Sequence, residues 1–373
     1  MKTRVLKLDP KNPDLTQVEE AAGVVDAGGL VAFPTETVYG LACRATHDSI
    51  ARLDKTKQRA LQKYYTLHIG RKRDVEKYVP SIGLRAKKLI KNAWPGPLTI
   101  VFDLNQKDIE KQCRSFEKGV YTSLYRDNSI GIRCPDNIVA QVLLRNAQMP
   151  VVAPSANITG KKPATNAGQV LEQFADKIDV LIDAGPCRYK KNSTVVNINK
   201  GNLRILRTGA YPPEDLENLS KVKFLFVCTG NTCRSPMAEV IFAKFWAEKI
   251  GSKVDQLENI GYKTMSAGTL GIDGLPASPE AVAVCAAKGL DLKAHKSTAL
   301  SKQLIDESDF IFAMSRGHCE RVVALVPEAA EKCLLLAENK EIPDPIGQSQ
   351  QVYETCAETI EQAIMIRISE YVI

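Results

Sequence analysis

The chain has 373 residues, of which 44% are hydrophobic and 25% are charged, and its net charge at pH 7 is +7. This composition is that of a globular protein long enough for two domains, and the mildly basic balance fits anionic substrates such as nucleotides or RNA. No run approaches about 18 consecutive apolar residues, so we expect no membrane-spanning helix. The ten cysteines form no secreted disulfide framework and the first residues show no signal peptide, which favours a cytoplasmic protein.

Strand-like and helix-like segments alternate in the first half of the chain. Helical spacing is found at 14–27 and 85–92, and Gly28-Gly29 is a suitable C-cap for the first helix. This alternation predicts a mixed α/β fold with polar loops at the strand ends. Strands are expected at 4–8, 30–33, 66–69, 98–102, 129–133, 151–153, 180–182, 194–198 and 203–206.

The polar loops of this half carry cations and short hydroxyl or amide groups. Cations beside strand ends are suited to phosphate or carboxylate ligands, and short hydroxyls and amides can orient a ligand. The alternative is that the hydroxyls cap helices and turns while the cations are solvated, and spacing alone leaves this open. No G-x-x-x-x-G-K-[ST] motif is present, so any ATP site here is not of the Walker type. The residues are Lys57, Arg59, Arg133 and Arg207, with Thr35, Thr37, Ser155, Asn157, Ser193 and Thr194.

Residues 1–210 resemble the threonylcarbamoyl-AMP synthase family, which begins the synthesis of tRNA threonylcarbamoyladenosine. The resemblance implies an open, twisted α/β sheet around a basic cavity. It also implies that L-threonine, bicarbonate and ATP give threonylcarbamoyl-AMP and pyrophosphate, and that the product passes to a tRNA-modifying complex. Seven motifs in the family's order carry it: Pro34-Thr-Glu-Thr-Val-Tyr-Gly40, Lys57-Gln-Arg59, Trp94-Pro-Gly-Pro-Leu-Thr99, Arg133-Cys-Pro135, Pro154-Ser-Ala-Asn157, Ser193-Thr-Val195 and Leu206-Arg-Thr-Gly209.

The same resemblance assigns site residues to two ligands. Arg133 would be the partner of the threonine carboxylate, and His68 would either assist a proton transfer or orient the ligand. Because the chemistry needs positioning and charge neutralisation, we expect Mg²⁺ on the ATP phosphates and no metal site made by the protein. The threonine pocket would comprise Thr37, His68, Arg133, Ala153 and Ser193. ATP would meet Arg59, Lys63, Ser129, Ser155, Pro163 and Arg207, with Lys57 and Asn157 close by.

The chain departs from this family in three places. Ala60 follows the Lys-x-Arg arginine where the family usually has Pro, and Tyr64-Tyr65 stands where it usually has Pro-Leu. Both changes lie in the predicted ATP loop, where they bear on the stiffness of the loop and on the role of Lys63. In place of the C-terminal domain of the long archaeal and eukaryotic members, the chain continues with a predicted linker at 211–221 and then a different sequence.

The second half restarts with a buried strand at 223–227, a tight loop and a helix. Further strands are expected at 309–313 and 333–336, and helices at 279–288, 316–325 and 351–371. Strands that alternate with helices predict a doubly wound parallel sheet with flanking helices. In such a fold the functional site lies at the carboxyl ends of the strands.

The loop after this first strand, Cys228-Thr-Gly-Asn-Thr-Cys-Arg-Ser-Pro236, has the residues of a phosphoryl-transfer site. A cysteine between a strand end and a helix N-terminus lies where backbone N–H groups bind anions and stabilise a thiolate. Arg234 can bind two phosphoryl oxygens, Ser235 can donate to the thiolate, and Asp344 is the candidate acid for the leaving group. The alternative is a buried structural cysteine, which the neighbouring Gly, Asn, Arg, Ser and Pro argue against.

Residues 222–373 resemble the low-molecular-weight protein phosphatase family, with Ser266-Ala-Gly-Thr269 and Asp344-Pro345 also in their expected places. The resemblance implies that Cys228 is the nucleophile, Arg234 the phosphate clamp and Asp344 the general acid. Cys233 would either trap oxidised Cys228 in a reversible disulfide or be an unreactive loop residue.

Two positions bear on the substrate of this half. Ile346 stands two residues after the acid, where tyrosine-directed members usually have an aromatic residue. Thr232 is the residue that bacterial protein-arginine phosphatases of the family carry, although it is also a neutral replacement for Ile or Val. We therefore place phospho-arginine slightly ahead of phosphotyrosine as the phosphorylated protein substrate.

The sequence thus predicts a fused enzyme of two α/β domains, 1–210 and 222–373, joined by the linker. The first would make threonylcarbamoyl-AMP and the second would be a cysteine-dependent protein phosphatase. One alternative is a phosphatase regulated by a first domain that binds nucleotide or RNA without making a product. Another is that the second domain is only a docking module, which the intact Cys228, Arg234 and Asp344 argue against.

Overall fold

The computed structural model describes residues 2–59, 65–199, 201–338 and 340–372. The chain forms two compact units, one of Met1–Ile82 and Ala86–Ser220 and the other of Gly83–Arg85 and Lys221–Ile373. In the described ranges, no helix combines the length and the apolar character needed to span a membrane.

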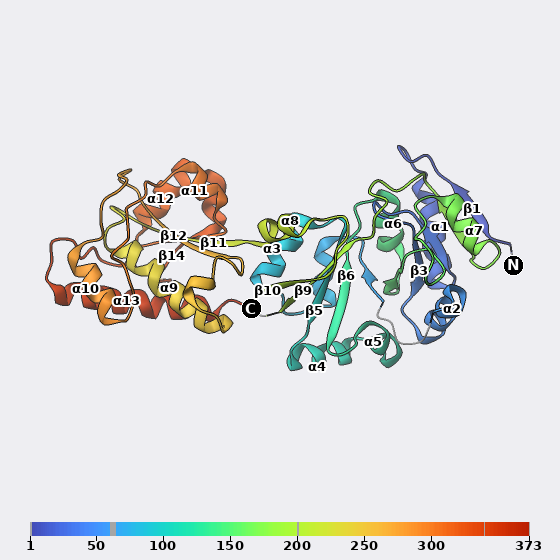
Figure 1. Cartoon of the computed structure of the whole chain (residues 1–373), viewed down its shortest axis with the longest axis horizontal. Coiled ribbons are helices and arrows are strands. Elements are labelled where there is room, and N and C mark those ends of the chain that lie inside the picture. The colour runs from blue at the N-terminus through green and yellow to red at the C-terminus, as the bar shows by residue number, and fades with distance from the viewer. Residues whose placement is uncertain (1, 60–64, 200, 339, 373) are drawn as a thin grey trace. The chain divides into compact units, whose positions relative to one another are not determined.

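The first unit is built on a mixed sheet, which confirms the predicted mixed α/β fold (Figure 1). Its ten described strands run in the order β1-β8-β2-β3-β7-β4-β6-β5-β9-β10, and the pairs are partly parallel and partly antiparallel. The strands are β1 (Arg4–Lys7), β2 (Val31–Phe33), β3 (Gly40–Arg44), β4 (Leu67–His68), β5 (Leu98–Asp103), β6 (Ser129–Arg133), β7 (Val151–Val152), β8 (Val180–Asp183), β9 (Thr194–Asn199) and β10 (Asn202–Arg207).

The register of the central strands aligns three polar side chains. His68 on β4 is paired with Arg133 on β6, and Arg133 is paired with Thr99 on β5. All three side chains are buried, in strands whose other residues are mostly apolar. A row of buried polar groups across neighbouring strands needs partners or a ligand, because an unpaired polar group in a protein interior is costly.

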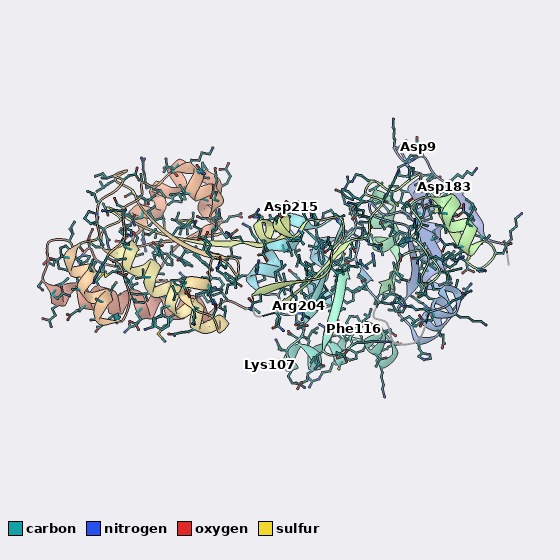
Figure 2. The ribbon with its side chains drawn as sticks, viewed as in Figure 1. Asp9, Lys107, Phe116, Asp183, Arg204 and Asp215 are labelled. Atoms are coloured by element: carbon teal, nitrogen blue, oxygen red, sulfur yellow. The ribbon has the colours of Figure 1, made fainter. Side chains whose placement is uncertain are left out.

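Helices cover this sheet and form its core with it. Asp14 caps α1, and Phe116, labelled in Figure 2, lies between α4 and α5 with its ring stacked 5.6 Å from that of Tyr78. The predicted linker carries a helix, α8, whose Leu216 is fully buried. The helices are α1 (Leu15–Asp26), α2 (His47–Lys57), α3 (Leu84–Ala93), α4 (Gln106–Ser115), α5 (Lys118–Leu124), α6 (Ile138–Asn146), α7 (Ala167–Phe174) and α8 (Pro213–Ser220), with a 3₁₀ helix at Lys72–Lys77.

The second unit contains a parallel sheet in the order β12-β11-β13-β14, which confirms the predicted doubly wound fold. In Figure 1, α9, α10 and α13 lie on one face of these strands and α11 and α12 on the other. The elements are β11 (Val222–Cys228), α9 (Arg234–Ile250), β12 (Tyr262–Gly268), α10 (Pro279–Ala287), α11 (Lys302–Glu307), β13 (Phe310–Ala313), α12 (Arg316–Leu325), β14 (Cys333–Leu335) and α13 (Gln350–Ser369), with 3₁₀ helices at Val254–Gln256 and Pro327–Lys332.

Alternate residues of β11 face the two helical layers. Phe224 and Phe226 pack with α9 and α13, whereas Leu225 and Val227 pack with α11 and α12. The continuous apolar run of β11 is therefore that of a strand buried on both faces. It ends at Cys228, which the sheet presents at the edge formed by the carboxyl ends of its strands.

Candidate active sites

Arg133 forms a buried ion pair in the first unit. Its Nη2 lies 2.8 Å from Oε1 of Glu36 and 2.7 Å from Oγ1 of Thr37, and the side chains of Arg133 and Glu36 are 6% and 2% exposed. The Nε of Arg133 has no hydrogen-bond partner among the described residues, although it is buried. The guanidinium therefore keeps one donor, Nε, for a further acceptor such as a carboxylate.

His68 is buried beside Arg133. Its Nδ1 lies 3.1 Å from the carbonyl oxygen of Thr66, which can only accept, so Nδ1 carries the proton and Nε2 is left as an acceptor. Burial and the charge of Arg133 lower the pKa of His68 to about 3. The imidazole is thus neutral at physiological pH and a weak base, better suited to accept a hydrogen bond than to carry a proton.

A cavity of about 180 Å³ brings seven of the predicted ligand residues together, with three arginines among them. Its volume is below the roughly 300–1,000 Å³ of pockets for drug-sized ligands, which suits an amino acid. The guanidinium of Arg207 is held by the carbonyl and hydroxyl oxygens of Ser193, at 2.9 and 3.0 Å from Nη2, and Arg59 stacks on the ring of Tyr65. The seven are His68, Arg133, Ala153, Ser193, Arg59, Ser155 and Arg207.

Three other predicted residues do not line this cavity. Thr37 is fully buried, and its hydroxyl oxygen accepts from Nη2 of Arg133. Ser129 lines an adjoining cavity of about 770 Å³ that shares Tyr65, Thr66 and Thr99 with the first. Pro163 lines another of about 760 Å³ that shares Val38 and Asn192. Lys63, Ala60 and Tyr64 lie outside the described residues.

Lys57 and Asn157 shape the loop that carries Ser155. The Lys57 ammonium donates to the carbonyl oxygens of Ser155 and Asn157, both at 2.5 Å, and burial together with the charge of Arg59 lowers the pKa of Lys57 to about 7. The Asn157 amide accepts from the Ser155 hydroxyl at 2.6 Å and donates to the carbonyls of Ile158 and Lys161. Both side chains therefore fix the shape of the loop that carries Ser155.

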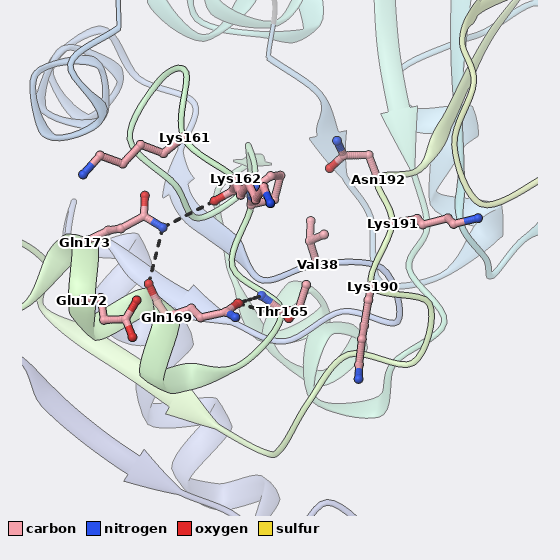
Figure 3. A pocket seen from close by; sticks show the side chains of 11 residues that line it. Val38, Lys161, Lys162, Thr165, Gln169, Glu172, Gln173, Lys190, Lys191 and Asn192 are labelled. Atoms are coloured by element: carbon pink, nitrogen blue, oxygen red, sulfur yellow. Dashed lines mark hydrogen bonds between the residues drawn. The ribbon is translucent and has the colours of Figure 1, made fainter.

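The 760 Å³ cavity has a rim of cations, shown in Figure 3. Exposed lysines from two loops surround it, and their ammonium groups make no ion pair or hydrogen bond with the described residues, whereas the one carboxylate among the described lining residues is that of Glu172. The lysine side chains in Figure 3 point in different directions rather than toward one point. This lysine rim, which comprises Lys161, Lys162, Lys190 and Lys191, therefore provides a positive field instead of a fixed set of contacts.

In the second unit, the loop after β11 wraps around Cys228. The Sγ atom lies 2.9 Å from Oγ of Ser235 and accepts from the backbone N–H of Asn231 at 3.2 Å. In the described part of the chain, the backbone N–H groups of Gly230, Thr232 and Cys233 have no protein acceptor. Free N–H groups at the N-terminus of α9 form an anion cradle over the sulfur.

Buried side chains hold this loop in shape. Asn231 has a φ of +53°, and its Nδ2 donates to the hydroxyls of Ser235 and Ser266 at 2.9 and 2.8 Å. Ser266 in turn donates to Glu239 at 2.6 Å. Gly268 allows the end of β12 to approach, because a Cβ there would lie 2.9 Å from backbone atoms of the loop.

Arg234 and Asp344 form an ion pair through Nη2 and Oδ2, with the arginine side chain buried and the carboxylate partly exposed. Arg234 also donates to the carbonyl oxygen of Ile342 at 3.1 Å and to Oγ1 of Thr229 at 3.1 Å, while its Nε is buried without a partner among the described groups. The structure thus brings the predicted nucleophile, clamp and acid to one loop cluster.

Cys233 and Thr232 lie on the same loop. Cys233 is buried, with its Sγ 3.3 Å from the Tyr353 hydroxyl and 3.4 Å from that of Ser278, and it is a free thiol, as is Cys228. The Thr232 hydroxyl lies 3.6 Å from the sulfur of Cys233. The disulfide between Cys228 and Cys233 stays a prediction.

Several site residues have no clear signal in the sequence. Glu36, the partner of Arg133, lies inside a motif but is a lone carboxylate among threonines. Thr99 and Asn192 reach the first cavity only through strand pairing and loop folding. Thr229 and His318, whose Oγ1 and Nε2 lie 2.9 Å apart, are 89 residues apart in the chain.

The described residues offer no set of ligands for Mg²⁺. In the described ranges, no cluster of three or more His, Cys, Asp and Glu side chains could hold a metal ion. The described side chains therefore do not fit a resident metal ion.

The folds and sites define a class of protein: an α/β unit with an arginine-lined cavity in the same chain as a unit built like a cysteine-loop phosphatase. Residues 23–209 match the Sua5–YciO–YrdC family model, described as telomere recombination. Residues 223–367 match the model for low molecular weight phosphotyrosine protein phosphatase.

Relatives and solved structures agree with these matches. The chain is 31% identical over 255 residues to the threonylcarbamoyl-AMP synthase of Pyrococcus abyssi, which covers 65% of this chain and 72% of that protein. It is 31% identical over 202 residues to that of Bacillus subtilis, covering 54% of this chain and 56% of the relative. The crystal structure of Pyrococcus abyssi Sua5 complexed with L-threonine has the same fold, with a TM-score of 0.52 and 23% identity over 71% of this chain and 92% of that one.

The chain therefore belongs to the Sua5–YciO–YrdC family, and its second unit is a low molecular weight phosphatase domain. This confirms both resemblances found in the sequence.

Proposed function

We propose that the first unit forms threonylcarbamoyl-AMP and pyrophosphate from L-threonine, bicarbonate and ATP, for the modification of tRNA. The observation that carries this proposal is the buried guanidinium of Arg133, which has an unpaired Nε and lines a small cavity together with His68, whose Nε2 is an acceptor. An α-carboxylate on Arg133 and a hydroxyl on His68 would match the two polar ends of threonine. The names of the relatives from Pyrococcus abyssi and Bacillus subtilis support the same activity.

The residues of the cavity would act by positioning. Arg133 would hold the threonine carboxylate so that its amine attacks bicarbonate, with loss of water, and the resulting carbamate attacks the α-phosphorus of ATP. Arg59 and Arg207 would neutralise the charge that develops as pyrophosphate leaves. With its lowered pKa, His68 would orient the threonine hydroxyl as an acceptor rather than serve as a proton carrier.

A pyrophosphate assay on Cys228→Ser protein tests this proposal, since phosphatase activity then cannot alter the phosphate count. Pyrophosphate should appear only when ATP, Mg²⁺, bicarbonate and threonine are all present. Arg59→Ala should abolish release, while Lys107→Ala, an exposed lysine on α4, should leave it unchanged. ATP binding without pyrophosphate release would instead favour a regulatory first unit that makes no product.

For the second unit, we infer hydrolysis of phosphorylated protein side chains through a cysteinyl-phosphate. The thiolate of Cys228 would attack phosphorus, the free loop N–H groups and Arg234 would bind the phosphoryl oxygens, and Asp344 would protonate the leaving group. Water would then hydrolyse the intermediate while Ser235 stabilises the departing thiolate. Phospho-arginine is the preferred substrate in this proposal, because Thr232 lies on the loop and Ile346 provides no aromatic ring.

Activity and preference need separate measurements. Hydrolysis of p-nitrophenyl phosphate that is lost in Cys228→Ser would establish the phosphatase, and its absence in the wild-type chain would favour a docking module. Phospho-arginine and phosphotyrosine peptides of one sequence should then be compared. Thr232→Ile should lower the ratio of kcat/KM for phospho-arginine to that for phosphotyrosine, and an unchanged ratio would remove the role of this hydroxyl.

A further inference from the structure

A histidine outside the proposed catalytic set is hydrogen-bonded to the phosphate clamp through one intermediary. His318 lies on α12 and is 7% exposed. Its Nε2 is 2.9 Å from Oγ1 of Thr229, and that hydroxyl oxygen accepts from Nη2 of Arg234 at 3.1 Å. The Nδ1 atom of His318 lies 2.8 Å from Oγ of Ser315.

The directions of these hydrogen bonds follow from the donors available. Arginine only donates, so Thr229 must accept from Arg234, and its single proton is then free for a different acceptor. Burial and the charge of Arg234 lower the pKa of His318 to about 4, so the ring is neutral and one of its nitrogens is an acceptor. If Nε2 accepts from Thr229 and Nδ1 donates to Ser315, the protons of the Thr229 hydroxyl and of the imidazole both have acceptors, and only the proton of the half-exposed Ser315 hydroxyl has no described partner. The opposite tautomer leaves the Thr229 proton without a described acceptor.

The hydrogen bonding of Ser315 supports this assignment of the tautomer, because Ser315 does not cap its helix in the usual way. It occupies the N-cap position of α12, where a serine hydroxyl normally accepts from a backbone N–H of the first turn, yet it makes no such bond. Its hydroxyl contacts the imidazole instead. A capping group used on a buried histidine indicates that the orientation of this ring matters to the site.

This row of hydrogen bonds holds the guanidinium of Arg234, which must keep its orientation during the reaction. The Nη2 group of Arg234 has two protons, one bonded to Thr229 and one to Asp344. Nε and Nη2 form the edge that binds two oxygens of a phosphoryl group, and Nε is free. When Asp344 turns to the leaving group, Thr229 and the carbonyl oxygen of Ile342 are the described contacts that remain on the guanidinium.

We propose that His318 is a positioning residue for Arg234: as a neutral acceptor it fixes the Thr229 hydroxyl, which keeps the guanidinium aimed at the phosphate after Asp344 departs. The role rests on the proposed phosphatase function. It predicts that anion capture at Cys228 depends on His318, whereas the intrinsic reactivity of the thiol does not.

Alkylation of Cys228 by a matched pair of reagents tests the proposal without any phosphatase turnover. Iodoacetate is an anion and needs the Arg234 clamp, while iodoacetamide is neutral, and peptide mass spectrometry reads the modified Cys228 directly. His318→Leu should slow iodoacetate by about ten-fold, as expected for a weakened hydrogen bond to a charged group. It should leave the iodoacetamide rate within about two-fold. His318→Gln keeps an acceptor and should restore most of the iodoacetate rate.

A control variant separates positioning from loosening of the helix. Val322→Ala removes buried volume from α12 without touching the hydrogen-bonded row, so its ratio of iodoacetate to iodoacetamide rates should equal that of the wild-type chain. Equal slowing of both reagents in His318→Leu, or no slowing of either, would overturn the proposal. A wild-type chain that alkylates as expected but hydrolyses no phosphate ester would instead contradict the proposed phosphatase function.

Discussion

Glu36 and Arg133 form an ion pair in which both side chains are buried, with Oε1 and Nη2 2.8 Å apart. The carboxylate also accepts from the backbone N–H of Asp136 through its other oxygen, at 3.1 Å. Two such charges pay a large desolvation cost, so they persist only with good geometry and further hydrogen bonds. The pair leaves Nε of Arg133 unsatisfied, and a substrate carboxylate would complete it.

Glu36→Ala should therefore destabilise the first unit strongly, by about 3–5 kcal/mol, because it leaves a buried cation without its partner. Urea unfolding followed by the fluorescence of buried Trp94, in a Trp246→Phe background, reports on this unit. The matched control is Asp136→Ala, which breaks the exposed pair with Arg188 at the same 2.8 Å and should cost less than about 1 kcal/mol. Similar losses in both variants would mean that burial of the pair is not what matters.

The pKa of His68 predicts how acid affects this unit. The folded-state pKa is about 3, whereas an unfolded histidine titrates near about 6.5. As the pH falls through this window, the unfolded chain takes up a proton that the folded chain does not, so stability is lost with decreasing pH. The free energy of unfolding should fall by about 1.4 kcal/mol per pH unit from this residue. His68→Gln should remove that contribution from Trp94-monitored unfolding curves, and an unchanged slope would contradict a neutral buried His68.

The sequence predicted the strands that carry motifs better than the segments between them. β6 has the bounds that the sequence predicts, since apolar residues alternate there and Arg133 ends the strand. β3 was not expected as a strand, because Gly40–Cys43 is buried on both faces and shows no alternation. The sequence analysis also does not predict α4 or α5: α4 is mostly polar, Asn105, which caps it, is one polar residue among many, and α5 has only seven residues.

In the candidate sites, too, residues within motifs could be predicted better than residues outside them. Residues such as Arg133 and Ser193 could be assigned to a site because their motifs follow one another in the order of the family. The structure brings them to one cavity. Their supporting partners could not be placed, because contacts such as Glu36 with Arg133 or Thr229 with His318 depend on strand register and helix rotation. The sequence also could not distinguish Lys57 as a ligand residue from Lys57 as a group that holds the Ser155 loop.

We expect the positive electrostatic field of the lysine rim to increase the rate at which ATP is captured. Substitution of all four lysines by Gln should lower kcat/KM for ATP by about ten-fold at low ionic strength and leave kcat unchanged, because capture rather than chemistry is affected. The kcat/KM values of the wild-type chain and of the variant should become equal at high salt, because the Debye length is then only a few ångström. Lys107→Gln with Lys111→Gln, two exposed lysines on α4, is the control and should have no effect. A deficit that persists at high salt would indicate direct contacts instead.

Asp344→Asn separates leaving-group protonation from phosphate binding. Phenyl phosphate has a poor leaving group and should be hydrolysed about 10²–10³-fold more slowly, while p-nitrophenyl phosphate, whose leaving group needs little protonation, should change far less. Steady-state kinetics on the two esters measure this ratio. Equal losses on both esters would show that Asp344 acts mainly through its ion pair with Arg234.

The most direct test of the proposed synthase activity is the mass of the nucleotide product. Cys228→Ser protein would be incubated with ATP, [¹⁵N]threonine and [¹³C]bicarbonate, and the adenylate products analysed at once by mass spectrometry. We predict an AMP adduct that carries both labels and that is lost in Arg133→Ala. An enzyme that binds ATP and threonine but forms no adduct, or an adduct that contains threonine without the bicarbonate carbon, would contradict the proposed synthase.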